Sequence, residues 1–308
     1  MIQIRGLTKR YGATTAVDGL GFDVRPGAVT GFLGPNGSGK STTMRMIIGL
    51  DRPDRGTATI NGKRYVELRW PLREVGALLE ARTYHPGRSA ESHLTALAAS
   101  NDVPRSRIGE VLAAVGLADV ARRRAGGFSL GMSQRLSIAA ALLGDPGVLL
   151  FDEPVNGLDP EGVRWIRDLM KSLAAEGRTV LLSSHLISEM ALTAERLVVI
   201  GRGTLIAETS VDEFAAQHQS EAVRVVTPTP QLMVTALSKE GVRPTVSDDG
   251  GIVVTGVPSA RIGEIAARSS LTLHELTPIR ASLEDAFMEL TSDAVEYRSR
   301  DRELVPAR

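Results

Sequence analysis

The sequence has no cysteine among its 308 residues. This absence excludes disulfides, thiol nucleophiles and thiolate metal sites, and it favours a reducing compartment, so we expect the cytoplasm. Net charge is also missing, because 36 lysines and arginines balance 36 aspartates and glutamates. The chain therefore lacks the overall positive charge that would by itself indicate nucleic acid as a partner.

Long apolar runs are missing as well, and crossing a membrane takes about 20 apolar residues. The longest stretches without a charged residue, 26–39 and 225–238, are interrupted by proline or glycine. Arg5 and Lys9 lie where a secretory signal would need an apolar core. The sequence therefore predicts neither secretion of this chain nor a membrane span. It predicts a globular chain of one large domain with a smaller appendage.

Apolar strands alternate with helices along residues 1–217, which favours a parallel α/β sheet with antiparallel strands on its N-terminal side. Within this predicted domain, residues 88–144 are mostly helical and form a predicted helical subdomain. The dipeptide Asn61-Gly62 predicts a two-residue turn. The expected strands are 2–4, 21–24, 29–33, 57–60, 75–79, 148–151, 179–184, 196–200 and 204–208.

A smaller domain is predicted over residues 218–291, where the pattern changes to β-α-β-β-α-β. This order is typical of a small α+β fold of the ferredoxin-like type. Its strands are expected at 223–226, 242–246, 252–255 and 271–276, and its helices at 230–239 and 258–267. We expect a regulatory or dimer-supporting module, followed by a charged, mobile tail at 292–308.

A glycine-rich loop between the predicted strand 29–33 and a predicted helix is the strongest signal in the sequence. It matches the phosphate-binding pattern G-x-x-x-x-G-K-S. Its glycines let backbone N–H groups point into one concavity at a helix N-terminus, the lysine reaches the β and γ phosphates, and the serine can ligate Mg²⁺. A flexible turn is the alternative, but a turn needs neither the Lys-Ser pair nor the flanking elements. The loop residues are Gly34, Pro35, Asn36, Gly37, Ser38, Gly39, Lys40 and Ser41.

Two carboxylates, Asp152 and Glu153, follow the apolar strand 148–151. A nucleotide hydrolase needs such an acidic element on a neighbouring strand to hold the metal and to polarise water. We expect Asp152 on or beside Mg²⁺, and Glu153 as the general base towards the attacking water. Alternation along the strand places the two on different faces, which suits different roles. A pair of solvated loop acids is the alternative.

The segment Phe128-Ser129-Leu130-Gly131-Met132, followed by Gln134-Arg135, lies upstream of the two carboxylates. With these motifs the chain resembles the ATP-binding cassette (ABC) ATPases over residues 1 to about 215. Leu130 and Met132 stand where the family signature LSGGQ has glycine and glutamine. Ser129 and the helix N-terminus at Gly131 retain the elements that touch phosphate. Taken alone, the segment is equally typical of an ordinary helix cap.

The resemblance implies further nucleotide contacts. Tyr11 stands where the family has an aromatic residue that stacks on adenine, although a packed surface tyrosine is the alternative. Thr42, directly after the loop, is implied in ATP binding. His185 follows the strand 179–184 and resembles the switch histidine that contacts the γ phosphate. It joins Glu153 and Lys40 as an implied catalytic residue, with a structural histidine as the alternative.

Glu80 occupies the place where the family usually has a glutamine that ligates Mg²⁺ and senses the membrane partner. A carboxylate can also ligate Mg²⁺, but it adds negative charge near the phosphates. Asn156 and Asp159 lie in a segment that resembles the loop crossing the dimer interface, although Asp159-Pro160 is also a good helix start. The implied metal ligands are Ser41, Asp152 and Glu80.

The resemblance implies a transporter ATPase. A second copy of the chain would form a head-to-tail dimer that encloses two ATP molecules, each between the loop 34–41 of one copy and the signature of the other. Hydrolysis would drive separate transmembrane permease subunits from the cytoplasmic face of the membrane, through a groove near Glu80 and residues 81–95. Four features together resemble the bacterial subfamily, bacitracin- and daunorubicin-resistance-like, that exports antibiotics, lantibiotics and other drugs. They are Glu80, the signature ending G-M-x-Q-R, and the segments 153–160 and 282–287.

A soluble cassette ATPase acting on nucleic acid or ribosomes is the rival interpretation. DNA-repair relatives carry long coiled coils between the two nucleotide motifs, and the segment from Lys40 to Asp152 is too short for them. Translation-associated relatives carry two cassettes, and this sequence has one. The basic run 122–124 has no interleaved aromatic residue, so we expect no nucleic-acid partner. A binding module without turnover is a third interpretation, which the presence of Glu153 disfavours.

Overall fold

The computed structural model describes residues 1–80, 83–218, 221–247, 250–280 and 283–291. The chain forms two compact units: the first comprises Met1–Val211 together with the described residues Leu290 and Thr291, and the second is Asp212–Glu289. The domain boundaries expected from the sequence, at residues 217 and 291, stay a prediction, and the expected tail 292–308 lies outside the described residues. Within the described ranges, no helix is long and apolar enough to cross a membrane.

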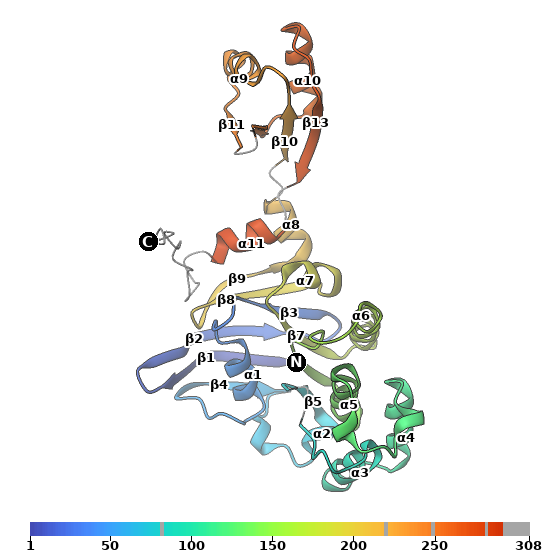
Figure 1. Cartoon of the computed structure of the whole chain (residues 1–308). Helices are drawn as coiled ribbons and strands as arrows, with labels where there is room; N and C mark the ends of the chain where they lie inside the picture. The colour runs from blue at the N-terminus through green and yellow to red at the C-terminus, as the bar shows by residue number, and fades with distance from the viewer. Residues whose placement is uncertain (81–82, 219–220, 248–249, 281–282, 292–308) are drawn as a thin grey trace, which may run out of the picture. The chain divides into compact units, whose positions relative to one another are not determined.

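A six-stranded sheet forms the centre of the first unit (Figure 1). All neighbouring strands in it are parallel except the last pair, the predicted hairpin. In spatial order the strands are β5 (Val75–Leu78), β6 (Val148–Asp152), β7 (Thr179–Ser184), β3 (Val29–Leu33), β8 (Arg196–Gly201) and β9 (Thr204–Ser210). β3, β6 and β7 are buried along their whole length, as is typical of parallel strands covered on both faces. Their carboxyl ends meet at one edge of the sheet.

The first unit also has an antiparallel sheet in the order β2-β1-β4, formed by β1 (Ile2–Tyr11), β2 (Thr14–Val24) and β4 (Arg55–Ile60). The sequence predicted only the apolar ends of β1 and β2. Their remaining parts are polar and irregular, with register shifts after Ile4, so they lack a clear strand pattern. Pairing of β1 on both sides nevertheless continues the ladder. The turn predicted at Asn61-Gly62 is confirmed, with φ values of 49° and 81°.

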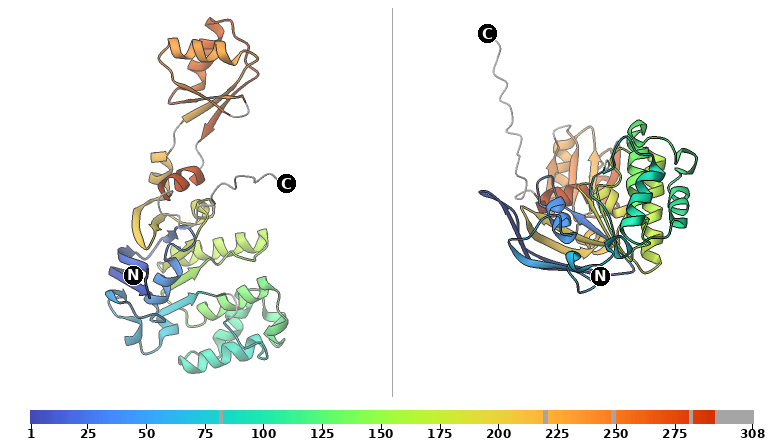
Figure 2. Two further views of the ribbon diagram at one scale, coloured as in Figure 1. Left: turned by 60° about the vertical axis from the view of Figure 1, so that its left-hand side comes forward. Right: turned by 90° about the horizontal axis from the view of Figure 1, so that it is seen from below.

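Three helices, α3 (Ala90–Ser100), α4 (Ser106–Ala114) and α5 (Leu130–Leu142), pack on one another in the predicted helical subdomain. They lie on the opposite side of this unit from the antiparallel strands (Figures 1 and 2). The helices α1 (Lys40–Ile47), α6 (Pro160–Ala175) and α7 (Ile187–Thr193) pack against the sheets. The shorter elements are η1 (Tyr65–Glu67), α2 (Pro71–Glu74), η2 (Ala118–Val120) and η3 (Ala125–Gly127).

The second unit contains an antiparallel sheet in the order β11-β12-β10-β13. The order of elements and of strands is that of the ferredoxin-like fold, as predicted. Both helices contribute to its core, through Met233 and Leu237 on one and Ile262 and Ile265 on the other. The elements are α8 (Val211–His218), β10 (Glu221–Val226), α9 (Pro230–Lys239), β11 (Pro244–Val246), β12 (Ile252–Thr255), α10 (Ser259–Arg268), β13 (Glu275–Arg280) and α11 (Leu283–Thr291).

The predicted strand 271–276 is wrong, because β13 runs from Glu275 to Arg280. Leu271 and Leu273 pack against the core of the second unit from the loop before the strand, so their apolar character reflects burial alone. The strand itself contains Pro278. Proline is tolerated there because β13 is an edge strand with a neighbour on one side only.

Candidate active site

The glycine-rich loop joins β3 to the first residue of α1, Lys40. A Cβ atom on Gly34 would lie 2.5 Å from the carbonyl oxygen of Ile200 and 2.5 Å from Ser38 Oγ. Gly39 has a φ of 100°, and a Cβ there would lie 2.5 Å from the carbonyl oxygen of Ala16. The loop is thus packed so closely that these two positions accept only glycine, which leaves its backbone free to face a ligand.

Lys40 is buried, with 7% of its surface exposed. Its Nζ donates hydrogen bonds to the carbonyl oxygens of Gly34 at 2.6 Å and Pro35 at 3.3 Å. Burial lowers the pKa of Lys40, and the carboxylates of Glu153 and Asp152 act in the opposite direction. The two neutral carbonyl oxygens bind an ammonium group more weakly than an anion would.

The loop opens into a cavity of about 230 Å³, which is also lined by Ala16 and Glu153. Ser38 Oγ is buried in the loop and has no hydrogen-bond partner among the described residues. An orphaned hydroxyl, a desolvated ammonium group and free N–H groups at the start of α1 together fit a bound phosphate chain. The residues present therefore suit the phosphate chain of a nucleoside triphosphate.

Asp152 and Glu153 stand at the end of β6, next to the end of β7. Asp152 is buried, and its carboxylate accepts a hydrogen bond from Ser183 Oγ. Glu153 has a φ of 48°, which turns its side chain away from that of Asp152. Its carboxylate oxygens each lie 3.0 Å from His185 Nδ1. The predicted base and the predicted switch histidine are therefore in direct contact, and Glu153 lines the cavity that Lys40 also lines.

Tyr11 lies at the end of β1 with 49% of its surface exposed, which leaves room for a planar ligand. Its hydroxyl donates a hydrogen bond of 2.8 Å to Asp51, and Asp51 also accepts one from Arg45 at 2.8 Å. Burial and the neighbouring Asp51 carboxylate raise the pKa of Tyr11, so the phenol stays neutral. The Lys9 ammonium lies 5.3 Å from the ring centroid, a cation–π distance.

Glu80 is exposed after β5 and does not line the cavity. Its charge acts on the Arg45 guanidinium at the other end of α1. The structure thus places two of the three expected metal ligands, Ser41 and Asp152, around the loop and β6. For all three residues the role of metal ligand stays a prediction.

The signature segment starts α5. Ser129 caps this helix, because its Oγ accepts a hydrogen bond of 3.2 Å from the Met132 N–H. Leu130 is 46% exposed and lies over Gly157, where an added Cβ would be 2.1 Å from Leu130 Cδ2. Gly131 also faces this loop. None of the signature residues Ser129–Met132 lines the cavity that contains Lys40 and Glu153.

The loop after β6 holds the expected interface residues. Asn156 is exposed, and Asp159 caps α6 by accepting a hydrogen bond of 2.8 Å from the Gly162 N–H. The helix start predicted at Asp159-Pro160 is therefore confirmed. Gln134 of α5 donates a hydrogen bond of 2.8 Å to the carbonyl oxygen of Pro154, which ties the helical subdomain to the residue after Glu153.

Known proteins resemble the chain along almost its whole length. A family model described as ABC transporter matches residues 17–156. The uncharacterized ABC transporter ATP-binding protein YhcH of Bacillus subtilis (strain 168) is 36% identical over 309 residues, which cover 96% of this chain and 97% of that protein. The chain belongs to the ABC transporter family. This ABC protein is an ATP-binding and ATP-hydrolysing transporter subunit, so the interpretation as a nucleic-acid or ribosome ATPase is wrong.

Two further comparisons concern cargo and assembly. The bacitracin transport ATP-binding protein BcrA of Bacillus licheniformis is 33% identical, with 94% of this ABC subunit and 97% of BcrA covered. A solved dimeric bacterial ABC transporter cassette matches 68% of this chain and 99% of its own, with a TM-score of 0.63 and 25% identity. Residues 221–284, within the ferredoxin-like unit, match a model described as a domain of unknown function.

Sequence reasoning missed several residues that this ABC subunit brings to the site. Ser183 bonds both the Asp152 side chain and the Glu153 backbone, and Asp51 bonds Tyr11. Tyr84 donates a hydrogen bond of 2.5 Å to Ser133, the residue after the signature. None of them lies in a motif. One signal for Ser183 was available in the sequence. The apolar runs that form β6 and β7 both end in polar residues.

Proposed function

We propose that this subunit binds two ATP molecules with Mg²⁺ in a homodimer, each between the loop 34–41 of one copy and Ser129–Met132 of the other. The observation that carries the proposal is the cavity that Lys40 shares with Glu153. No signature residue lines it, so a second copy would have to supply that side of the nucleotide. The likeness to a dimeric cassette supports this arrangement.

Each residue has a role that follows from its surroundings. Lys40 would exchange its bonds to the Gly34 and Pro35 carbonyls for bonds to phosphate oxygens, which are stronger because both partners are charged. Glu153, with its carboxylate at the cavity, would take the proton of the attacking water. His185 would hold that carboxylate and face the γ phosphate.

Mg²⁺, when bound, would neutralise charge on the β and γ phosphates, with Ser41, Asp152 and Glu80 as the residues that would hold it. The Tyr11 ring would carry the adenine base, because its hydroxyl bond to Asp51 fixes the ring plane while one side stays exposed. Asn156 and Asp159 would meet the second copy.

The test is the variant Glu153→Gln, with Glu161→Gln on the exposed first turn of α6 as matched control. We expect the first variant to bind ATP and dimerise with Mg-ATP while its turnover falls about 100-fold or more, because the base is lost. The control should keep wild-type turnover. Phosphate release and size-exclusion chromatography measure both properties. Normal hydrolysis by Glu153→Gln would remove Glu153 from the role of base.

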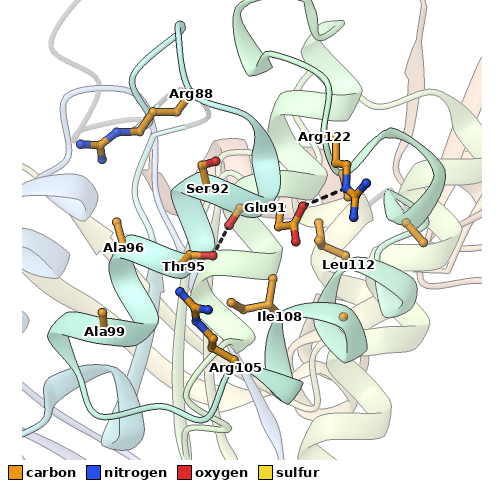
Figure 3. A pocket seen from close by; sticks show the side chains of 13 residues that line it. Arg88, Glu91, Ser92, Thr95, Ala96, Ala99, Arg105, Ile108, Leu112 and Arg122 are labelled. Atoms are coloured by element: carbon orange, nitrogen blue, oxygen red, sulfur yellow. Dashed lines mark hydrogen bonds and ion pairs between the residues drawn. The ribbon is translucent and has the colours of Figure 1, made fainter.

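We further propose that the subunit works at the cytoplasmic face of the membrane, attached to separate permease subunits that export an antibiotic or a peptide. The similarity to a bacitracin transport protein over 94% of the chain supports this cargo class. Part of the docking surface expected near Glu80 and residues 81–95 lines a groove of about 850 Å³ in the helical subdomain, through Arg88, Glu91, Ser92 and Thr95 (Figure 3).

The groove lies between α3, α4 and the η2 segment, and small residues such as Ala96, Ala99 and Gly109 line it. Small residues let a helix of a partner approach closely. Arg122 pairs with Glu91 at 3.5 Å, whereas among the described residues Arg88 and Arg105 form no ion pair (Figure 3). The groove therefore suits a helix that carries acidic residues.

Charge reversal in the groove tests the docking surface. We expect the double variant Arg88→Glu/Arg105→Glu to move a tagged copy of the protein from the membrane fraction to the soluble fraction. In the Glu153→Gln background with Mg-ATP, a polytopic membrane protein should co-purify, and the double variant should lose it. Arg243→Glu, an exposed residue of the second unit, serves as control. Equal membrane association of the double variant and the Arg243→Glu control would contradict docking at this groove.

A further inference from the structure

Ser183 connects the two strands that end at the carboxylates. Asp152 of β6 pairs with Ser183 of β7 in the parallel ladder, so their side chains lie on the same face of the sheet. Ser183 is fully buried. Its hydroxyl donates a hydrogen bond to the Asp152 carboxylate and accepts one of 3.0 Å from the Glu153 backbone N–H. One hydroxyl thus contacts both acidic residues.

The backbone at Glu153 needs such support. Its φ of 48° lies in the left-handed region, which side chains other than glycine, asparagine and aspartate rarely adopt. Strained residues of this kind persist only where the surrounding structure fixes them. The bond from the Glu153 N–H to Ser183 provides that fixation. Without it, the peptide could relax and turn the side chain away from the cavity.

The carboxylate of Glu153 is held by the same strand end. His185, two residues after Ser183, contacts both carboxylate oxygens at 3.0 Å. Ser184, between them, points elsewhere: its hydroxyl donates to Glu189 at 3.1 Å and accepts from the Leu186 N–H at 3.0 Å. The end of β7 therefore fixes Glu153 twice, at its backbone through Ser183 and at its side chain through His185.

We infer that Ser183 is a positioning residue for hydrolysis, which sets the carboxylate of Glu153 at the cavity through the hydrogen bond to its backbone. The inference rests on the proposed role of Glu153 as base. It requires no contact between Ser183 and ATP. Ser183 acts on the catalytic step and leaves nucleotide binding and dimer formation unchanged.

Three variants of the full-length protein test the inference. We expect Ser183→Ala to lower kcat about 10- to 100-fold, as misplacement of a catalytic group does, with the KM for ATP, nucleotide affinity and ATP-driven dimerisation within about twofold of wild type. Ser183→Thr keeps a hydroxyl and should recover most of kcat. Ser184→Ala removes a neighbouring buried hydroxyl that does not touch Glu153, and it should keep kcat within about twofold.

A double variant separates positioning from general destabilisation. Because Ser183 acts through Glu153, Ser183→Ala should cause no further loss of turnover in the Glu153→Gln background. An additive loss, an unchanged kcat in Ser183→Ala, or a parallel loss of ATP affinity would each overturn the inference. Normal hydrolysis by Glu153→Gln alone would instead overturn the proposed base, so the two failures are distinguishable.

Discussion

At the residue scale, Lys40 shows that the site is built for an anion rather than for stability. Its ammonium group is desolvated, and its direct partners are two backbone carbonyls. The buried Ser38 hydroxyl beside it has no partner among the described residues. Both groups cost free energy in the nucleotide-free protein. Binding of a phosphate chain would satisfy both at once.

The depressed pKa of Lys40 predicts a pH dependence of stability. Burial lowers this pKa below its ordinary 10.5, so between the two values the unfolded chain binds more protons than the folded protein. The stability of the folded protein therefore rises with pH in that window. We expect the free energy of unfolding of nucleotide-free wild type to increase relative to Lys40→Met from neutral pH towards the ordinary lysine pKa.

Urea unfolding of both proteins across this window checks the prediction. Lys40→Met keeps the length of the side chain and removes the titrating group, so it isolates the contribution of the ammonium. A difference between the two proteins that stays constant with pH would contradict it. ATP should stabilise only the wild type, since the variant lacks the phosphate contact.

The predictable part of the site consists of residues that lie in one short segment. The loop 34–41 and the Asp152-Glu153 pair carry their chemistry in local sequence order, and the structure brings Glu153 to the cavity that the loop lines. The role of His185 followed only from a family resemblance, and its contact with Glu153 was not predicted. Ser183 could not be found in this way, because its function depends on the register of β6 against β7 and on one positive φ.

At the scale of elements, α5 and the loop after β6 are fitted to each other. Leu130, in place of the usual glycine, lies over Gly157, whose φ is 77°. The hydrogen bond from Gln134 to Pro154 joins the same two elements. The divergent signature therefore has a packing partner within its own chain, and Gly157 leaves the space that the leucine side chain needs.

We predict that Gly157→Ala lowers the free energy of unfolding by about 1–3 kcal/mol, because alanine is strained at this φ and its Cβ would meet Leu130. Leu130→Ala removes the contact but not the strain. The double variant should therefore be less destabilised than the sum of the single variants, by about 0.5 kcal/mol or more. Thermal unfolding of the four proteins measures this coupling. Strict additivity would show that the two residues do not meet.

Predictions of elements succeeded where burial and hydrogen bonding coincide. β3, β6 and β7 are short apolar runs and lie close to their expected bounds. β1 and β2 extend through polar residues that pairing alone holds in the sheet. At 271–276 the two properties separate: Leu271 and Leu273 are packed without strand pairing, and the paired residues that follow include Pro278. The amino-acid composition of a segment indicates burial, but it does not indicate which residues pair in a strand.

At the scale of the whole molecule, each unit has its own buried core. The core of the first unit includes Leu150 of β6, and that of the second includes Ile252 of β12, both fully buried. Every residue that lines the cavity with Lys40 belongs to the first unit. Nucleotide affinity should therefore depend on one core and tolerate damage to the other.

We predict that Ile252→Ala destabilises the second unit by about 2–5 kcal/mol through the cavity it leaves, while the Kd for ATP stays within about twofold of wild type. The matched variant Leu150→Ala should weaken ATP binding, since it creates a similar cavity two residues before Asp152. Calorimetry with and without ATP, together with nucleotide titration, measures both effects. A loss of ATP affinity in Ile252→Ala equal to that in Leu150→Ala would contradict the assignment of binding to the first unit.

The same variant examines the proposed dimer-supporting role of the ferredoxin-like unit. In the Glu153→Gln background, Mg-ATP should hold the dimer together, so its dissociation constant can be measured by sedimentation. If the second unit supports dimer formation, Ile252→Ala should raise that constant while ATP affinity is unchanged. An unchanged constant, with the second unit shown to be destabilised, would exclude support of the dimer and leave regulation as the role to be tested.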